Sequence, residues 1–599
     1  MQCLPTSDFP RLPAMARVLV TASESEEDLC LLTLSTSAAC SAGYAAVPLA
    51  TARDSDDEEC EGESTGVPLA LARDADSTDA ECESEPTGAA HLPLTLVSDD
   101  STDAPPAKKR SRLTKTLRRP RLTKPFRRPR QMGPEPAIVM SDADAQALFS
   151  WPRIALIAAM AVAGENLWQA SCLFAAMRMS SHFSGLGAAE VALDMLRAWA
   201  GLVARMELGL SHGWTCEKVK ALQRVLQDRV PGHCVFDDIL DRLLDVGEDI
   251  RRLTRPRDRR TRTPKGALNF ERVRSVIMTS RVSDHAQCVT HGCLCRVERV
   301  EVDVSGSPCR PWSSARKARR EERRTHQDII LLLAWCRVMR EDRPLVAIHE
   351  NVRGFDVSLL FDLLGDIYHI QVLHAAPQEL GFTFVSRPRV YCILTLRSRV
   401  ERVLDVQDVY RAIARDLARP VAELPQLFSA TAEEKLEAEN AARAKCGMEP
   451  LTTPSRCWRY LLTTRQATCL AFHESQAVGR ADLAACYVDL TPSAGFARPS
   501  RHVPTLRRCA HRIWSWRHAR WLLSSELALL MGFPVRPTCA AASGVSPDIF
   551  TLTEPQALGN AMHVASVGCI IAAALSSCRR VSMGTRQAHP FHGRGYFVA

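Results

Sequence analysis

The chain has 599 residues, of which 46% are hydrophobic and 24% charged, and its formal net charge is +8. That length is enough for a large core and for two or more domains. The 22 cysteines are scattered along a long chain without a basic-then-apolar N-terminal signal, which disfavours a secreted disulfide scaffold. The longest apolar stretch, residues 154–164, is too short to span a bilayer. We therefore expect a soluble intracellular protein with mostly reduced thiols and no membrane partner.

The N-terminal part has two charge blocks of opposite sign. Residues 1–104 contain a loose acidic repeat: "VPLATARDSDDEECE" at position 47 recurs as "VPLALARDADSTDAE" at position 67, with a degraded third copy at 92–104. With so few apolar positions this segment cannot bury a core, so we expect it to be disordered. Residues 105–135 form a basic segment, in which 108–130 hold twelve Lys and Arg and no acid. It is interpreted as a nuclear-import signal ("PPAKKRSR") and phosphate-binding tail, or as a merely solvated linker.

Residues 140–396 alternate short apolar runs with helical patterns, as expected for an α/β fold with a parallel sheet flanked by helices. Amphipathic helices are expected in "TCEKVKALQRVLQ", from position 215, and in "RRTHQDIILLLAWCRVM", from position 323. Strands are expected at five places: 177–183, 233–237, 300–304, 344–349 and 389–396.

A basic insert is expected near 247–290, with an exposed loop at 251–265. It is followed by "CVTHGCLC", a motif that brings together four soft side chains: Cys288, His291, Cys293 and Cys295. These could hold zinc, but their spacing matches no usual knuckle, so free thiols are the favoured interpretation and no metal is predicted.

The remainder of the chain is less regular. Residues 397–520 cluster Arg, His and Trp ("RRCAHRIWSWRHARW"), a mixture of cations and stacking surfaces that suits nucleic acid. Residues 521–578 return to helical patterns in "LLSSELALLMGFP" and "ALGNAMHVASVGCIIAAAL", and residues 579–599 form a tail.

Ligand sites in open parallel sheets form at the carboxyl ends of the strands. The first strand leads into a glycine-rich turn containing Ser184, Gly185 and Gly187, whose amides could approach a ligand. Glu217 follows the expected second strand, where a carboxylate commonly accepts ribose hydroxyls, and Asp237 and Asp238 end the third. Alone, each acid is equally explained as a helix cap. Together they describe a site for a nucleoside-bearing cofactor.

The next two strands lead to reactive groups. "GSPCRPWS" places Cys309 on a loop stiffened by two prolines, and "HENV" places Glu350 after the following strand. A thiolate beside a carboxylic acid suits covalent catalysis with proton donation. A buried inert cysteine is the alternative, but a proline-flanked loop is a poor place for one.

Six motifs occur in the order of the conserved blocks of the DNA cytosine-5 methyltransferases, which the chain resembles over residues 175–575: "HFSGLG", "GSPCRPWS", "HENV", "SRPRVY", "ELALLMGFP" and "LGNAMHV". The resemblance implies a Rossmann-like S-adenosylmethionine-dependent methyltransferase sheet over 140–396, completed by 521–578. Residues 397–520 would be a smaller target-recognition domain, beside a disordered N-terminal region.

The resemblance also implies roles for the reactive residues. Cys309 would attack carbon 6 of a flipped cytosine, and Glu350 would protonate or hydrogen-bond ring nitrogen 3. Arg387 and Arg389 would hold the base. Carbon 5 would then take the methyl group of S-adenosyl-L-methionine.

The cofactor would be held by residues at the other strand ends. Phe183 would lie against the adenine, Glu217 would bind the ribose, Asp238 the adenine amino group, and Asn560 would fold back beside the first strand. The chain departs from the family pattern in having Ala188 for a third glycine, Ser307 for a first proline and Val385 for a glutamine.

We expect a nuclear DNA cytosine-5 methyltransferase whose partner is double-stranded DNA. The sequence leaves open methylation of RNA instead, and a nucleic-acid-binding homologue without activity. A nicotinamide dehydrogenase is disfavoured, because the first turn lacks the full Gly-x-Gly-x-x-Gly and that function leaves the cysteine loop unexplained.

Overall fold

The computed structural model describes residues 141–164, 177–203, 209, 211–253, 269–313, 323–418, 430–476, 486–492, 498–507, 512–546 and 555–581. The acidic segment, the basic segment, most of the loop at 251–265 and the tail after 581 lie outside these residues.

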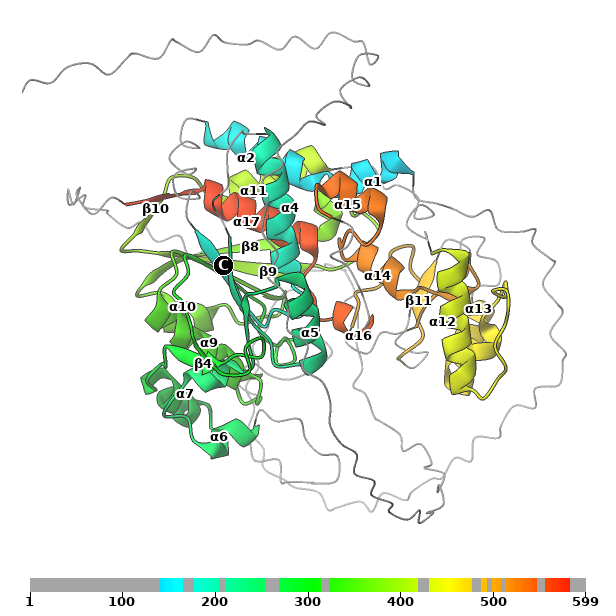
Figure 1. Cartoon of the computed structure of the whole chain (residues 1–599), viewed down its shortest axis with the longest axis horizontal. Coiled ribbons are helices and arrows are strands. Elements are labelled where there is room, and N and C mark those ends of the chain that lie inside the picture. Colours follow the sequence, from blue (N-terminus) through cyan, green and yellow to red (C-terminus); the bar gives the residue numbers. More distant parts are fainter. Residues whose placement is uncertain are drawn as a thin grey trace, which may run out of the picture. The chain divides into compact units, whose positions relative to one another are not determined.

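A seven-stranded sheet, in the order β3-β2-β1-β6-β7-β9-β8, is the centre of the fold (Figure 1). The five strands from β3 to β7 run parallel, whereas β9 is antiparallel to both of its neighbours. The strands are β1 (Arg178–His182), β2 (Ser211–Cys216), β3 (Cys234–Phe236), β6 (Val302–Ser305), β7 (Val346–Val352), β8 (Tyr368–Ala375) and β9 (Arg389–Leu396). The predicted α/β class is therefore confirmed, and the five expected strands correspond to β1, β3, β6, β7 and β9.

Two layers of helices cover the sheet (Figure 1). One layer packs α2 (Trp151–Ala163), α4 (Ala188–Val203), α11 (Val406–Leu417) and α17 (Val564–Ser576) against one another. The other includes α7 (Phe270–Thr279), α9 (Ile329–Asp342) and α10 (Ser358–Leu364). The central strands are buried on both faces because helices cover both, and β1 and β6 carry buried polar side chains such as Ser180 and Asp303.

Shorter elements complete this part of the fold. They are α1 (Asp142–Phe149), α5 (Lys220–Arg229), the 3₁₀ helix η1 (Ile239–Arg242), α6 (Glu248–Leu253), η2 (Pro377–Leu380), α14 (Ser524–Leu530), α15 (Pro537–Ser543) and α16 (Pro555–Leu558). Two small antiparallel pairs join β4 (His285–Gln287) to β5 (Leu294–Arg296) and β10 (Val400–Arg402) to β14 (Cys578–Arg580).

The helix expected from position 215 begins later than predicted. Residues 215 and 216 belong to β2, which pairs with β1, and α5 starts only at Lys220. The side chains of Trp214 and Cys216 are buried in the sheet, and this burial outweighs the helical pattern.

A second, smaller core lies between residues 430 and 523, built around Trp458, Trp514 and Trp521. Its elements are α12 (Ala432–Lys445), η4 (Arg459–Leu461), α13 (Thr464–Gln476), β11 (Tyr487–Asp489), β12 (Ile513–Ser515) and β13 (Arg520–Trp521). Helix α11, which we expected to belong to the recognition region, packs instead in the main core through Val409 and Ile413. The smaller core therefore starts after residue 418 rather than at 397.

No single described helix is both long and apolar enough to cross a membrane. Helices α1 and α2 satisfy that criterion only when they are taken together, across a bend of 41°.

Candidate active site

The carboxyl ends of β1, β2, β3, β6 and β7 lie at one edge of the sheet, since these strands are parallel. Strand β9 runs the other way and therefore starts at this edge, where Arg389 pairs with Val352 and Tyr391 with Glu350. The topology thus brings Glu350 and the Arg-x-Arg motif together.

The turn after β1 has an unusual backbone. Phe183 has a φ of 56°, and Gly185 and Gly187 have φ values of 58° and 72°. A non-glycine residue in this left-handed region is uncommon, and such strain gathers at ligand sites. Ser184 ties the turn to β2, because its amide and its hydroxyl both donate to the carbonyl of Cys216 at 3.2 Å. The turn opens onto the N-terminus of α4, where free amides favour a polar ligand group.

The three carboxylates expected after β2 and β3 lie at those strand ends. Buried Glu217 accepts hydrogen bonds from the amides of Gly185 and Val219, both at 2.9 Å. Asp238 is the N-cap of η1 and forms an ion pair with Lys218 at 2.5 Å. Its contacts are therefore those of a helix cap, which was one of the two interpretations of this residue. Asp237 accepts from Gln223 at 2.8 Å. Glu217 is thus the carboxylate joined directly to the first turn.

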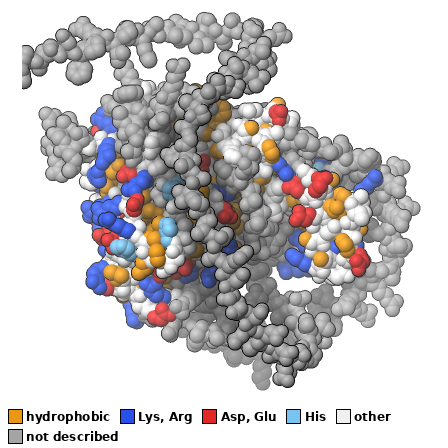
Figure 2. All heavy atoms as spheres, in the orientation of Figure 1, with side chains coloured by type: hydrophobic (Ala, Val, Ile, Leu, Met, Phe, Trp, Pro, Cys, Tyr) orange, Lys and Arg blue, Asp and Glu red, His pale blue; other side chains and the backbone are white. Residues whose placement is uncertain are grey.

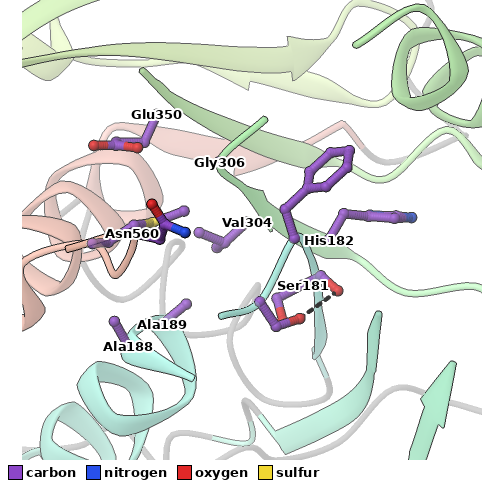
Figure 3. Close-up of a pocket in the computed structure, with 11 residues that line it drawn as sticks. Ser181, His182, Ala188, Ala189, Val304, Gly306, Glu350 and Asn560 are labelled. Carbon is purple, nitrogen blue, oxygen red and sulfur yellow. Dashed lines mark hydrogen bonds between the residues drawn. The ribbon is translucent and has the colours of Figure 1, made fainter. Parts of the chain in front are cut away.

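A pocket at this edge is lined by β1 and its turn, α4, β6, β7 and the segment before α17 (Figure 3). Figure 3 shows Glu350 and Asn560 facing it from one side and Ala188 and Ala189 from another. Its lining residues are Ser181, His182, Phe183, Ser184, Ala188, Ala189, Val304, Gly306, Glu350, Asn560 and Met562. Three candidate cofactor residues (Phe183, Ser184 and Asn560) and one candidate catalytic residue (Glu350) therefore share one pocket.

The cysteine loop is attached to β7 by buried hydrogen bonds. The Ser307 hydroxyl hydrogen-bonds His349 Nε2 at 2.9 Å, and Asn351 Nδ2 donates to the Ser307 carbonyl at 3.1 Å. His349 is fully buried, which lowers its pKa to about 3, so the ring is neutral at ordinary pH. The Ser307 side chain thus replaces the more usual proline with a side-chain anchor.

Beyond this anchor, the loop turns around Cys309. The carbonyl of Cys309 accepts from the amides of Trp312 and Ser313 at 2.9 and 3.0 Å. Trp312 is buried edge-on against Phe355, with ring centroids 5.4 Å apart. Cys309 itself is exposed. The two fixed ends of the turn hold an accessible thiol in place.

Charged groups surround that thiol. Arg389 Nε lies 2.8 Å from Glu350 Oε1, and both side chains are largely buried. Partial loss of hydration raises the pKa of Cys309, opposed by the positive charge of Arg389 and reinforced by the negative charge of Glu350. The two charges thus adjust, in opposite directions, a pKa that is raised mainly by loss of hydration.

Arg387 has different contacts. Its buried guanidinium donates to the carbonyls of Ala561 at 2.6 Å and Gly559 at 3.3 Å. Burial and the neighbouring Arg389 lower its pKa to about 9. Arg387 therefore fastens the segment that carries Asn560, a contact the sequence did not suggest.

Sequence reasoning also missed a buried network beneath the site. Asp303 on β6 accepts from Ser180 Oγ at 2.8 Å and Trp335 Nε1 at 3.0 Å, and lies 2.8 Å from His182 Nδ1. The sequence feature that could have revealed this network is Asp303, an acidic residue within the otherwise apolar end of the strand pattern "VEVDV". Because His182 precedes Phe183, this network fixes the start of the strained turn.

Two of the tryptophans expected to offer stacking surfaces in the recognition region are buried, whereas Trp516 is half-buried and Arg517 is exposed. Trp514 is fully buried and Trp521 almost so, and Arg512 lies 3.7 Å from the centre of the Trp521 ring. Arg520 is buried in an ion pair with Glu526 at 2.6 Å. Much of the Arg and Trp pattern therefore builds a core.

Residues 296–571 match the family model described as C-5 cytosine-specific DNA methylase. This part of the chain is a C-5 cytosine-specific DNA methylase domain. The match contains Cys309, Glu350, Arg387, Arg389 and Asn560, whereas β1, β2 and β3 precede it. No curated protein matches the chain.

Three solved structures are similar to this chain, and each similarity covers 67% of it and 98% of the other protein. They are the S. pombe Dnmt2 methyltransferase (13% identity, TM-score 0.31), a protein described as a DNA modification methyltransferase encoded within a prophage (E. coli; 14%, 0.33) and the Entamoeba histolytica methyltransferase EhMeth (12%, 0.30).

Proposed function

We propose that this methyltransferase transfers a methyl group from S-adenosyl-L-methionine to carbon 5 of cytosine in double-stranded DNA. The observation that carries the proposal is the arrangement of Cys309, Glu350 and Arg389 beside the pocket at the end of β1 and β6. The formal net charge of +8 favours a polyanionic partner. On the face shown in Figure 2, Lys and Arg side chains are interspersed with Asp and Glu.

Cys309 is the proposed nucleophile. As a thiolate it forms a bond to carbon 6 of a base flipped out of the duplex, which makes carbon 5 nucleophilic. After methyl transfer, loss of the carbon 5 proton and cleavage of the carbon–sulfur bond restore the ring. The thiol is exposed on an anchored turn and is therefore accessible to such a base.

Glu350 is the proposed partner of ring nitrogen 3. In its protonated form the carboxyl donates to that nitrogen as the thiolate attacks, so that negative charge does not accumulate on the ring. Arg389 positions the Glu350 side chain, and its positive charge stabilises the ionised thiol of Cys309. Arg387 is proposed to position Asn560 rather than to touch the base.

The pocket fits a nucleoside-bearing cofactor. Phe183, whose backbone is strained, and Ser184 line it, and the buried carboxylate of Glu217 is joined to the same turn through the amide of Gly185. A Cβ atom on Gly306 would lie 2.8 Å from Met562 Cε and 3.3 Å from Glu350 Oε2, so a side chain at this position would displace the end of Met562. Asp238, with Gly187 at the start of α4, completes the proposed cofactor set. When bound, S-adenosyl-L-methionine supplies the electrophilic methyl group.

The test is transfer of labelled methyl groups to duplex DNA and to transfer RNA by the full chain and by Cys309→Ala. Label on DNA that disappears in the variant is the expected result. Label on RNA alone would show that RNA, rather than DNA, is the substrate. No label on either, with no binding of S-adenosylhomocysteine, would overturn the proposal in favour of an inactive homologue.

We also propose that the segment "PPAKKRSR" at 105–112 directs the protein to the nucleus. Replacing Lys108, Lys109 and Arg110 by alanine in a fluorescent fusion should abolish nuclear accumulation. Unchanged accumulation would refute this function for the segment.

A further inference from the structure

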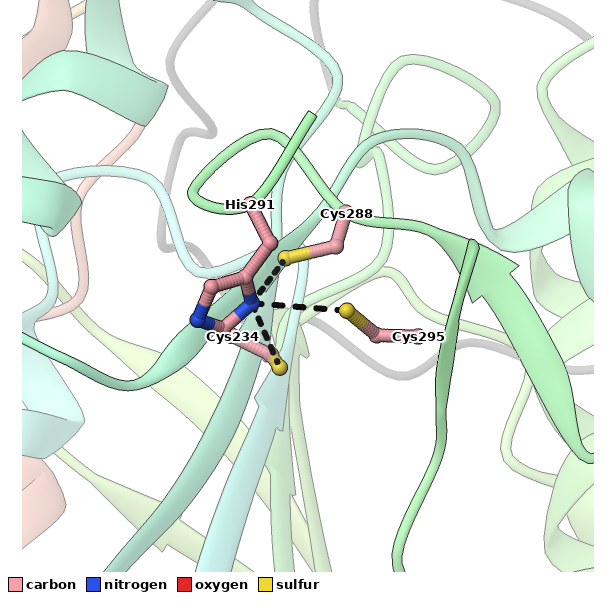
Figure 4. A group of neighbouring side chains, drawn as sticks. All are labelled: Cys234, Cys288, His291 and Cys295. Atoms are coloured by element: carbon pink, nitrogen blue, oxygen red, sulfur yellow. Dashed lines mark hydrogen bonds between the residues drawn. The ribbon is translucent and has the colours of Figure 1, made fainter. Parts of the chain in front are cut away.

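Four soft side chains converge at the open edge of the main sheet, outside the proposed active site. Cys234, Cys288, His291 and Cys295 place their ligand atoms within 4.8 Å of one another (Figure 4). The sequence had suggested Cys293 as the fourth member of this group. The structure instead adds Cys234, which lies 57 residues before His291.

The distances within the group are those of a tetrahedral metal site. His291 Nδ1 lies 3.5 Å from the Cys234 sulfur, 3.4 Å from that of Cys288 and 3.3 Å from that of Cys295. Zinc bonds of about 2.3 Å to sulfur and about 2.0 Å to nitrogen, at tetrahedral angles, place a sulfur about 3.5 Å from the nitrogen. The four side chains are therefore already spaced as zinc ligands.

Hydrogen bonds alone do not explain this convergence. Figure 4 shows all three sulfurs directed at the same ring nitrogen of His291. A ring nitrogen of histidine carries either one lone pair or one proton, depending on the tautomer and charge of the ring. It can therefore make only one good hydrogen bond in the ring plane. A cation placed between the four atoms satisfies all of them at once.

Backbone pairing brings the four ligands together. Cys234 lies on the edge strand β3, and Cys295 lies on β5 of the β4–β5 hairpin. The hairpin joins the edge strand through the amide of Val289, which donates to the Val235 carbonyl at 2.7 Å, and through the bridge between Phe236 and Cys288. The site is thus assembled from two segments that the sheet holds side by side.

We propose that Cys234, Cys288, His291 and Cys295 bind one zinc ion that clamps the β4–β5 hairpin onto the edge of the main sheet. A Cys₃His set leaves zinc no open position, so the role is structural. Edge strand β3 has only three residues and is followed directly by Asp237, whose amide donates to the Gln287 carbonyl at 3.1 Å. The ion would therefore also fix the end of β3 beside the proposed cofactor site.

Cys293 provides a matched control, because it lies in the same hairpin but outside the ligand group. Its sulfur is exposed and 3.8 Å from that of Cys295. The metal content of the purified full chain is measured by mass spectrometry for the wild type and for Cys288→Ser, Cys295→Ser and Cys293→Ser. We expect one zinc per chain in the wild type and in Cys293→Ser, and none in the other two variants.

If the cysteine variants do not fold, a spectroscopic measurement on the wild-type protein still tests the site. Wild-type protein with its metal exchanged for cobalt(II) should show the thiolate charge-transfer and ligand-field absorption of a tetrahedral Cys₃His site. A strong chelator should lower its melting temperature by several degrees. Wild-type protein without stoichiometric zinc, a disulfide among these cysteines, or loss of zinc in Cys293→Ser would each overturn the proposed ligand set. None of these measurements depends on methyl transfer, so the zinc proposal can be refuted or supported independently of the proposed function.

Discussion

Replacing Ser307 by alanine tests how the cysteine loop is anchored. His349 is fully buried, and its Nε2 bonds the Ser307 hydroxyl, whereas its Nδ1 has no hydrogen-bond partner among the described residues. The variant therefore leaves a buried imidazole with no hydrogen bond. Leaving such a group unsatisfied costs about 1–3 kcal/mol. Asn351 Nδ2 loses its hydrogen bond to the Ser307 hydroxyl at 3.2 Å but keeps the one to the Ser307 carbonyl, so the expected loss of unfolding free energy is about 2 kcal/mol.

A second variant supplies the control. The His349 ring lies between those of Trp335 and Phe355, with centroids at 4.9 and 5.0 Å, so phenylalanine fits the same space. In Ser307→Ala combined with His349→Phe, both polar partners are gone, and the double variant should be less destabilised than the sum of the single ones by about 1 kcal/mol.

Urea unfolding followed by circular dichroism measures all four proteins. The reasoning is refuted if Ser307→Ala changes the unfolding free energy by less than about 0.5 kcal/mol, which is the ordinary effect of a surface substitution. Strict additivity of the two changes would also refute it.

Three further predictions concern the same region. Glu350→Gln should lower the pKa of the Cys309 thiol, since Glu350 raises it, and peptide-level iodoacetamide labelling should move to lower pH; labelling that stays or moves to higher pH would contradict this. Burial lowers the pKa of His349 and of His563 to about 3, so protons bind the unfolded chain first and stability should fall as pH drops from about 6.5 towards 3, by about 1.4 kcal/mol per pH unit for each histidine. Urea unfolding midpoints measured between pH 7 and 5 test this. In His349→Phe, the contribution of His349 to the pH dependence of stability should be absent. Gly306→Ala should weaken binding of S-adenosylhomocysteine about tenfold in calorimetry, because the new methyl group displaces Met562 and crowds Glu350, which both line the pocket. Unchanged affinity would show that Met562 moves without narrowing the pocket.

The sequence predicted the parts of the site that follow strand ends. The expected strands at 300–304 and 344–349 are short, mostly apolar segments that correspond to β6 and β7, so the places of Cys309 and Glu350 could be inferred from local pattern. The contact between Glu350 and Arg389 could not be inferred in this way, because it depends on β9 being antiparallel to β7. The motif resemblance implied only that the two residues act on the same base.

The missed features depend on tertiary contacts. Strand β8 is an edge strand with a half-polar face, so it lacks a strong apolar run. Cys234 joins the cysteine cluster only because the β4–β5 hairpin pairs with β3, and no spacing rule reports that pairing. Trp514 carries the composition of a stacking surface, but burial in the smaller core decides its role.

The central claim is that Cys309 bonds covalently to a cytosine. Duplex DNA containing 5-fluorocytosine tests it most directly, because carbon 5 then has no proton to lose after methyl transfer and the adduct persists. With S-adenosyl-L-methionine present, we predict a complex that survives denaturation and maps by peptide mass spectrometry to Cys309, and that is absent in Cys309→Ala. No adduct on duplex DNA, or an adduct that maps to another exposed cysteine such as Cys446, would contradict the account.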